Sequence, residues 1–170
     1  MAAALLLSAL HIHNYPILSP IDEVNHFDSV VKLSDGEMVR RGDLLGSAAL
    51  HAMACRSIDA PDYTPPPCVP DNVPVAFSNM NISYMHPPLY YASTGLVARA
   101  LDSVGIAPNL LVGARMVNAL WFAIGLLLLY GVMGELGVTG CARAAAALLP
   151  ALIPFVVYQS ATVTNDVTRV

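Results

Sequence analysis

Charged side chains are scarce in this chain. They make up 12% of its 170 residues, about half of the share found in an ordinary soluble domain. The net charge of −4 is modest, and Lys and Arg form no cluster of the kind that binds nucleic acid. The mean hydropathy is high, at +0.59. The sequence therefore predicts a membrane protein that contacts lipid and has no nucleic-acid partner.

Two long runs contain no charged side chain, Met116–Gly134 and Ala144–Val163. At about 1.5 Å per residue, each is long enough to cross a hydrocarbon core of about 30 Å as a helix. The short connection at Gly137–Arg143 predicts an antiparallel helical hairpin. Pro150 and Pro154 are expected to kink the second run or break it locally.

The first ten residues are apolar, but as a helix they would cover only about half of a bilayer. No Lys or Arg precedes Lys32, and no clear small-x-small cleavage site follows, which argues against the alternative of a secretory signal peptide. We therefore expect a first spanning helix whose beginning is missing, and a chain that is the front part of a longer protein.

These runs predict an all-α integral membrane protein with multi-pass transmembrane helices. The long polar loop is expected to carry short helices at the membrane interface. The four predicted segments are a partial first transmembrane helix (1–13), the loop (14–114), a transmembrane hairpin (115–163) and the start of a further segment (164–170).

Two helices are expected within the loop. The first runs from about Pro20 to Leu33, with Ser19 as N-cap and Asp22 in the position of a capping acid. The second opens at Pro87-Pro88 and stops near Gly105. Its predicted apolar face follows helical spacing and consists of Leu89, Ser93, Leu96, Val97, Ala100, Leu101 and Val104.

Four motifs follow one another along the chain: P-x-D-E-x-x-H at Pro20–His26, H-P-P-L-Y-Y at His86–Tyr91, A-R-x-x-N at Ala114–Asn118 and T-N-D at Thr164–Asp166. In this order, with apolar runs between them, the sequence resembles the N-terminal part of GT-C glycosyltransferases. These are multi-pass enzymes that take a sugar from a polyprenyl-phosphate carrier. The resemblance is closest to the bacterial branch of protein mannosyltransferases and lipid A aminoarabinose transferases.

The resemblance implies a transferase of the bacterial plasma membrane that moves a sugar from a polyprenyl-phosphate carrier to an extracytoplasmic acceptor. It also implies that the loop 14–114 lies outside the cytoplasm. In that family an acidic residue at the start of this loop acts at the active site, and Asp22 is the matching catalytic position, with Glu23 adjacent.

Further candidates follow from the chemistry of the transfer. Asp22 and His26 lie one helical turn apart and are candidate ligands of a divalent metal, which would assist a phosphate leaving group. The candidate substrate-binding residues are His86, Arg115, Asn165 and Asp166.

Each candidate also has a structural interpretation. Asp22 and Glu23 would stabilise the first turn of a helix by about 0.3–1 kcal/mol, and His26 would simply be packed. Arg115 would anchor a helix end by snorkelling, and Asn165-Asp166 would be the polar end of a span. A non-catalytic membrane protein, acting as an assembly partner or carrier-lipid binder, is the alternative function.

The expected topology places the three cysteines on two different sides of the membrane. Cys55 and Cys68 enclose a short loop facing an oxidising compartment, and we expect a disulfide between them. Cys141 lies in the connection on the opposite face and is expected to stay reduced.

Overall fold

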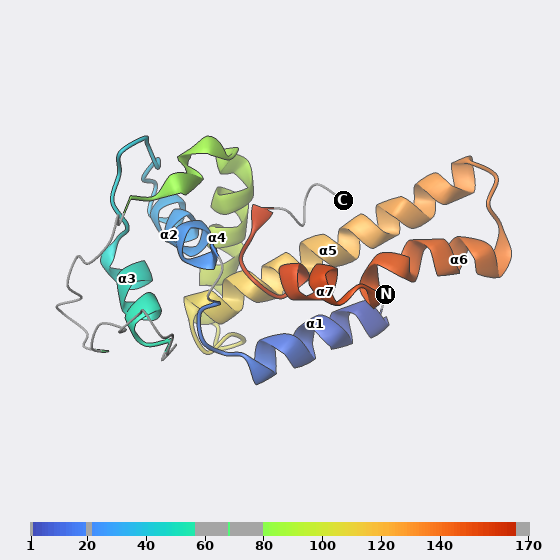
Figure 1. The fold of residues 1–170 in the computed structure, drawn as a ribbon, viewed down its shortest axis with the longest axis horizontal. Helices are drawn as coiled ribbons and strands as arrows, with labels where there is room; N and C mark the ends of the chain where they lie inside the picture. Colours follow the sequence, from blue (N-terminus) through green and yellow to red (C-terminus); the bar gives the residue numbers. More distant parts are fainter. Residues whose placement is uncertain (1, 20–21, 57–67, 69–79, 166–170) are drawn as a thin grey trace, which may run out of the picture. The chain divides into compact units, whose positions relative to one another are not determined.

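The computed structural model describes residues 2–19, 22–56, 68 and 80–165 (Figure 1). Within these residues the chain forms seven α-helices and two short 3-10 helices, and its one strand-like pairing is an isolated bridge between Leu44 and Met80. The chain divides into two compact units. The central unit is Tyr15–Ala114, and the terminal unit combines Met1–Asn14 with Arg115–Val170.

The expected multi-pass architecture is wrong. Helix α5 (Leu110–Glu135) has 26 residues, and its most apolar 18-residue stretch has a mean hydropathy of 2.0. It is the one helix in the described part of the chain that is long and apolar enough to cross a membrane by itself. Helix α1 (Ala2–Asn14) is apolar but has only 13 residues, about 20 Å of helix. One such helix, or two if a bent pair counts as one span, is too few for a multi-pass protein.

The second long apolar run fails as a continuous span because of its prolines. It forms α6 (Gly140–Leu148), a 3-10 turn η2 (Leu149–Leu152) and α7 (Pro154–Ser160), with a bend of 74° at the break. Ile153 is extended, with φ −90° and ψ 114°, because the ring of a following proline disfavours the helical conformation.

Polar side chains join the helices of the terminal unit. Ser8 Oγ of α1 and Ser160 Oγ of α7 lie 2.8 Å apart in a buried hydrogen bond. Asn118, in the apolar run of α5, donates through Nδ2 to the carbonyl oxygens of Gln159 at 2.9 Å and Thr162 at 2.5 Å. Asn118 is fully buried, so these bonds offset the cost of placing an amide in an apolar helix.

Helices α5 and α6 form the expected antiparallel hairpin (Figure 1). Arg143 Nε donates to the carbonyl oxygen of Tyr130 at 2.7 Å, and its guanidinium lies 3.9 Å from the centre of the Tyr130 ring. A cavity of about 240 Å³ opens beside this pair. Its lining is almost wholly apolar: Leu126, Leu127, Tyr130, Ala144, Ala147 and Leu148.

The central unit is built on α2 (Glu23–Ser34) and α4 (Pro88–Ser103), with α3 (Ser47–Ala54) and the 3-10 turn η1 (Ile82–Met85) beside α2 (Figure 1). Helix α4 crosses α2 very closely at Gly95. A Cβ atom at that position would lie 2.6 Å from the carbonyl oxygen of Val30. Only a glycine fits such an approach between two helix backbones.

The face of α4 that is buried differs from the predicted apolar face. The structure buries Tyr90, Tyr91, Thr94, Gly95 and Ala98, whereas Leu89, Leu96, Val97 and Val104 are exposed. Small side chains permit the close crossing with α2, and larger aliphatic ones would prevent it. The predicted apolar face, which was expected to lie at the membrane interface, is therefore not the face that packs against α2.

A buried carboxylate organises the rest of the central unit. Asp28 accepts hydrogen bonds from Gly46 N and Asn81 Nδ2, each at 2.7 Å, and pairs with Lys32 Nζ at 2.7 Å. Asn81 is fully buried, and its Oδ1 accepts from Ser83 N at 2.7 Å to cap η1. These bonds fix α2 against the segments that precede α3 and α4.

Candidate functional site

Asp22 stands at the head of α2 in an unusual backbone conformation. It is the N-cap residue, with φ 37° and ψ −12°, and it is the one non-glycine residue with positive φ in the described part of the chain. Its side chain is exposed and makes no capping hydrogen bond. The predicted capping by Ser19 and Asp22 is therefore wrong, and helix α2 begins at Glu23 rather than Pro20.

The left-handed conformation of Asp22 has an energetic cost. For most L-residues it amounts to about 1–2 kcal/mol, and Asp tolerates it better than most. Backbone strain of this kind gathers at functional sites, where surrounding structure holds a residue in place. Asp22 therefore presents an exposed carboxylate at the N-terminal end of α2.

Glu23, the adjacent candidate, plays a structural part. It is buried, with an exposed fraction of 2%, and its Oε2 accepts the backbone N–H of Ser19 at 2.6 Å. A glutamate that reaches back to the chain before a helix ties down that segment. The two neighbouring acids thus differ: Asp22 faces solvent, and Glu23 positions the turn on which Asp22 sits.

A cluster of three rings lies one turn along α2. His26 Nδ1 and the Tyr91 hydroxyl are joined by a 2.7 Å hydrogen bond, and their rings are stacked with centres 5.8 Å apart. The centre of the His86 ring lies 5.4 Å from that of His26. This ring cluster (His26, His86 and Tyr91) brings the P-x-D-E-x-x-H and H-P-P-L-Y-Y motifs together in the central unit.

Tyr91 is the member of the ring cluster that sequence reasoning did not select. It lies within the second motif and on the small-residue face of α4. The sequence signal that could have identified it is the helical spacing of Tyr91, Thr94, Gly95 and Ala98, which places these residues on one face of α4.

The two other motifs meet in the terminal unit. The bond from Asn118 to Thr162 brings A-R-x-x-N beside the segment that leads into T-N-D. Arg115 is buried, with an exposed fraction of 1%, and Asn165 is also buried. Arg115 therefore does not extend outward as a snorkelling side chain would. Asp166 lies outside the described residues.

The structure brings together a different metal-type cluster from the predicted one. Asp22 and His26 belong to no group of three or more His, Cys, Asp or Glu in the described residues whose ligand atoms lie close enough to hold a metal. His26 Nδ1 is already engaged by Tyr91, so sharing a metal through that nitrogen would require loss of this bond. The group that the structure does contain is His51, Cys55 and Cys68.

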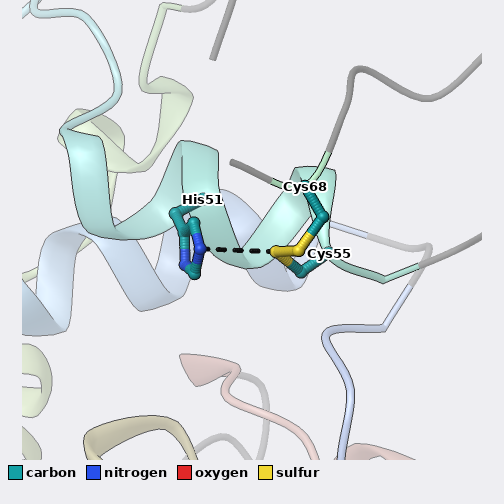
Figure 2. A group of neighbouring side chains, drawn as sticks. All are labelled: His51, Cys55 and Cys68. Carbon is teal, nitrogen blue, oxygen red and sulfur yellow. Dashed lines mark hydrogen bonds between the residues drawn. A yellow bond between two sulfur atoms is a disulfide. The ribbon is translucent and has the colours of Figure 1, made fainter. Parts of the chain in front are cut away.

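Cys55 and Cys68 form the expected disulfide (Figure 2). Cys55 caps the end of α3, and Cys68 is exposed. His51 Nε2 lies 3.4 Å from Cys55 Sγ. A disulfide sulfur carries no proton, so Cys55 Sγ can only accept in this contact. Cys141 is free and exposed.

Comparison with protein-family models, with curated proteins and with solved structures gave no match. The functional argument therefore depends on the side chains themselves.

Proposed function

We propose that this chain is a membrane-associated protein of the bacterial plasma membrane that transfers a sugar from a polyprenyl-phosphate carrier to an extracytoplasmic acceptor, with Asp22 as the base. The exposed, uncapped carboxylate of Asp22 in its left-handed conformation carries the proposal. Helix α5, which is long and apolar enough to span a membrane, supports the membrane association.

The chemistry needs one base near the acceptor. Asp22 takes the proton of the acceptor hydroxyl. The hydroxyl oxygen then bonds to the anomeric carbon, and the bond from that carbon to the carrier phosphate breaks. Glu23 holds the turn through Ser19 N. The ring cluster fixes α2 against α4 one turn away, so the carboxylate stands next to the first turn of a packed helix.

A second candidate is a non-catalytic protein that binds the carrier lipid or assists assembly. The apolar cavity between α5 and α6 favours it, because its lining side chains suit a hydrocarbon chain. The polyprenyl tail of the same carrier is the occupant that this candidate predicts.

One experiment separates the two candidates. The full chain, in lipid nanodiscs, is offered radiolabelled polyprenyl-phosphate mannose and polyprenyl-phosphate aminoarabinose, with bacterial envelope fractions as acceptor. The transferase predicts transfer that falls by at least about 10²-fold in Asp22→Asn. Asp102→Asn, which changes another exposed acid, should retain the wild-type rate. An equal rate in Asp22→Asn and wild type would remove Asp22 from the reaction.

Carrier binding without transfer would favour the second candidate. Binding should then weaken in Ala144→Phe, since Ala144 lines the cavity and is also exposed. Ala145→Phe is the matched control, because Ala145 is exposed on the same helix and does not line the cavity.

A further inference from the structure

Two residues of types that bind metals lie at the end of α3, His51 in its last turn and Cys55 as its C-cap residue. His51 and Cys55 are four residues apart, the spacing that stacks side chains along a helix, and their Nε2 and Sγ atoms lie 3.4 Å apart. Cys68 completes the group, and all three ligand atoms lie within 4.8 Å of one another (Figure 2).

The distances suit a tetrahedral site for a thiophilic metal. With a Zn–S bond of about 2.3 Å and a Zn–N bond of about 2.1 Å, neighbouring nitrogen and sulfur ligands lie about 3.6 Å apart. The separation of His51 Nε2 and Cys55 Sγ is already near that value. Only the two sulfurs, now covalently joined, would have to separate, and Cys68 is exposed.

We propose that His51, Cys55 and Cys68 form a redox-gated metal site, closed as a disulfide when oxidised and able to bind a Zn²⁺-type ion when reduced. A dithiol reductant supplies two electrons and two protons. The sulfur–sulfur bond breaks, two thiols form and the reductant becomes its own disulfide. Metal binding then releases the two thiol protons, and it requires His51 to accept through the nitrogen that now faces Cys55.

Such a site would keep Cys55 and Cys68 joined in both redox states. The disulfide closes the loop between them covalently, and the metal closes the same loop by coordination. Three protein ligands leave a fourth position for water, which is the arrangement of an accessible rather than a fully enclosed zinc site. His51 and Cys55 are half-buried and Cys68 is exposed, so both the reductant and the ion can reach the cluster.

Cobalt titration tests the proposal on the full chain in mild detergent. The Cys141→Ser background removes the one free thiol of the described residues. The protein is reduced with dithiothreitol, freed of reductant without oxygen and titrated with Co²⁺. We expect one equivalent of Co²⁺ to produce a sulfur-to-cobalt charge-transfer band and the visible bands of a four-coordinate ion, and Zn²⁺ to displace it. The oxidised protein should show neither band.

Variants of His51 decide whether the imidazole takes part. His51→Ala should weaken Co²⁺ binding at least tenfold, since losing even a hydrogen-bond partner of a ligand typically costs about 10–100-fold. His51→Cys restores a ligand and should restore tight binding. His13→Ala is the control, because His13 is exposed on α1. Circular dichroism checks that each variant keeps its helices.

Three outcomes would overturn the proposal. They are a reduced protein that gives no charge-transfer band, equal Co²⁺ affinity in His51→Ala and wild type, and equal Co²⁺ binding before and after reduction. The first would leave Cys55 and Cys68 as a simple loop closure, the second would exclude His51 from the ligand set, and the third would place the bound ion at other residues.

Discussion

His26 Nδ1 lies 2.7 Å from the hydroxyl oxygen of Tyr91, although 65 residues separate the two side chains in sequence. The bond is buried and connects α2 with α4 beside the proposed base. Tyr91→Phe removes only the hydroxyl and leaves a buried ring nitrogen without this bond. We expect a loss of about 1–3 kcal/mol in unfolding free energy, measured by denaturant unfolding in detergent.

The control for this change is Tyr84→Phe, at a half-buried tyrosine of η1. It should alter stability by less than about 0.5 kcal/mol. Equal effects of the two substitutions would mean that the His26–Tyr91 bond adds nothing to stability.

Two variants of Asp22 distinguish the effect of its backbone conformation from the effect of its charge. Asn tolerates a positive φ as well as Asp does, so Asp22→Asn should leave the unfolding midpoint unchanged while transfer is lost. Asp22→Val places a β-branched residue at φ 37° and should lower stability by about 1–2 kcal/mol. A thermal unfolding series on both variants makes the comparison. Equal stability of the two would show that this turn relaxes readily.

The crossing of α2 and α4 depends on Gly95. In Gly95→Ala the new Cβ would meet Val30 O at 2.6 Å and Ser34 Cβ at 2.8 Å, and a backbone oxygen cannot move aside without shifting the helix. We expect a loss of about 1–3 kcal/mol, read from denaturant unfolding.

Gly131→Ala in α5 is the matched substitution for Gly95→Ala. A Cβ atom at Gly131 would have nothing within 4 Å of it, and alanine is the better helix former by about 1 kcal/mol. The change should therefore be neutral or stabilising. A similar loss in both variants would point to a general effect of the added methyl rather than to the helix crossing.

Two ion pairs of the central unit should differ in importance. Asp28 is buried and also accepts from Gly46 and Asn81. In Asp28→Asn the new amide NH2 group would face these hydrogen-bond donors, and the positive charge of Lys32 would lose its carboxylate partner. A loss of about 3 kcal/mol is expected. Asp35 and Arg99 form an exposed pair, and Asp35→Asn should cost less than about 1 kcal/mol. Parallel unfolding curves would reveal the difference, and equal losses would contradict it.

Local features of this chain could be predicted from the sequence where one short segment determines the outcome. The break beside Pro154 and the turn between α5 and α6 each follow from nearby residues. The pairing of Cys55 with Cys68 was predicted from their spacing together with the expected oxidising side of the membrane. The multi-pass architecture was wrong because length and missing charge were treated as sufficient for a span. The bend at Ile153 shows that a proline can divide an apolar run into two short helices.

Features that depend on tertiary contacts could not be predicted from the sequence. The buried face of α4 is determined by the close approach of Gly95 to Val30, which no apolar periodicity encodes. The ring cluster requires α2 and α4 to pair in one register, so Tyr91 could not be assigned a partner from spacing alone. Asp22 was selected through resemblance, whereas its left-handed backbone and lack of a capping bond became visible only in the fold.

The burial of Asn81 limits the hosts in which this protein can be produced. Asn81-Ile82-Ser83 is an acceptor tripeptide for N-linked glycans in eukaryotic secretion. The nitrogen that would carry the glycan is the one that donates to Asp28 and Ser29 in the folded protein. A glycan replaces one of the two hydrogens of this nitrogen, and because Asn81 is fully buried, a chain glycosylated before it folds could not close its core around the sugar. Secretion from yeast or insect cells would thus trap part of the product as misfolded glycoprotein, whereas a bacterial host would avoid this competition.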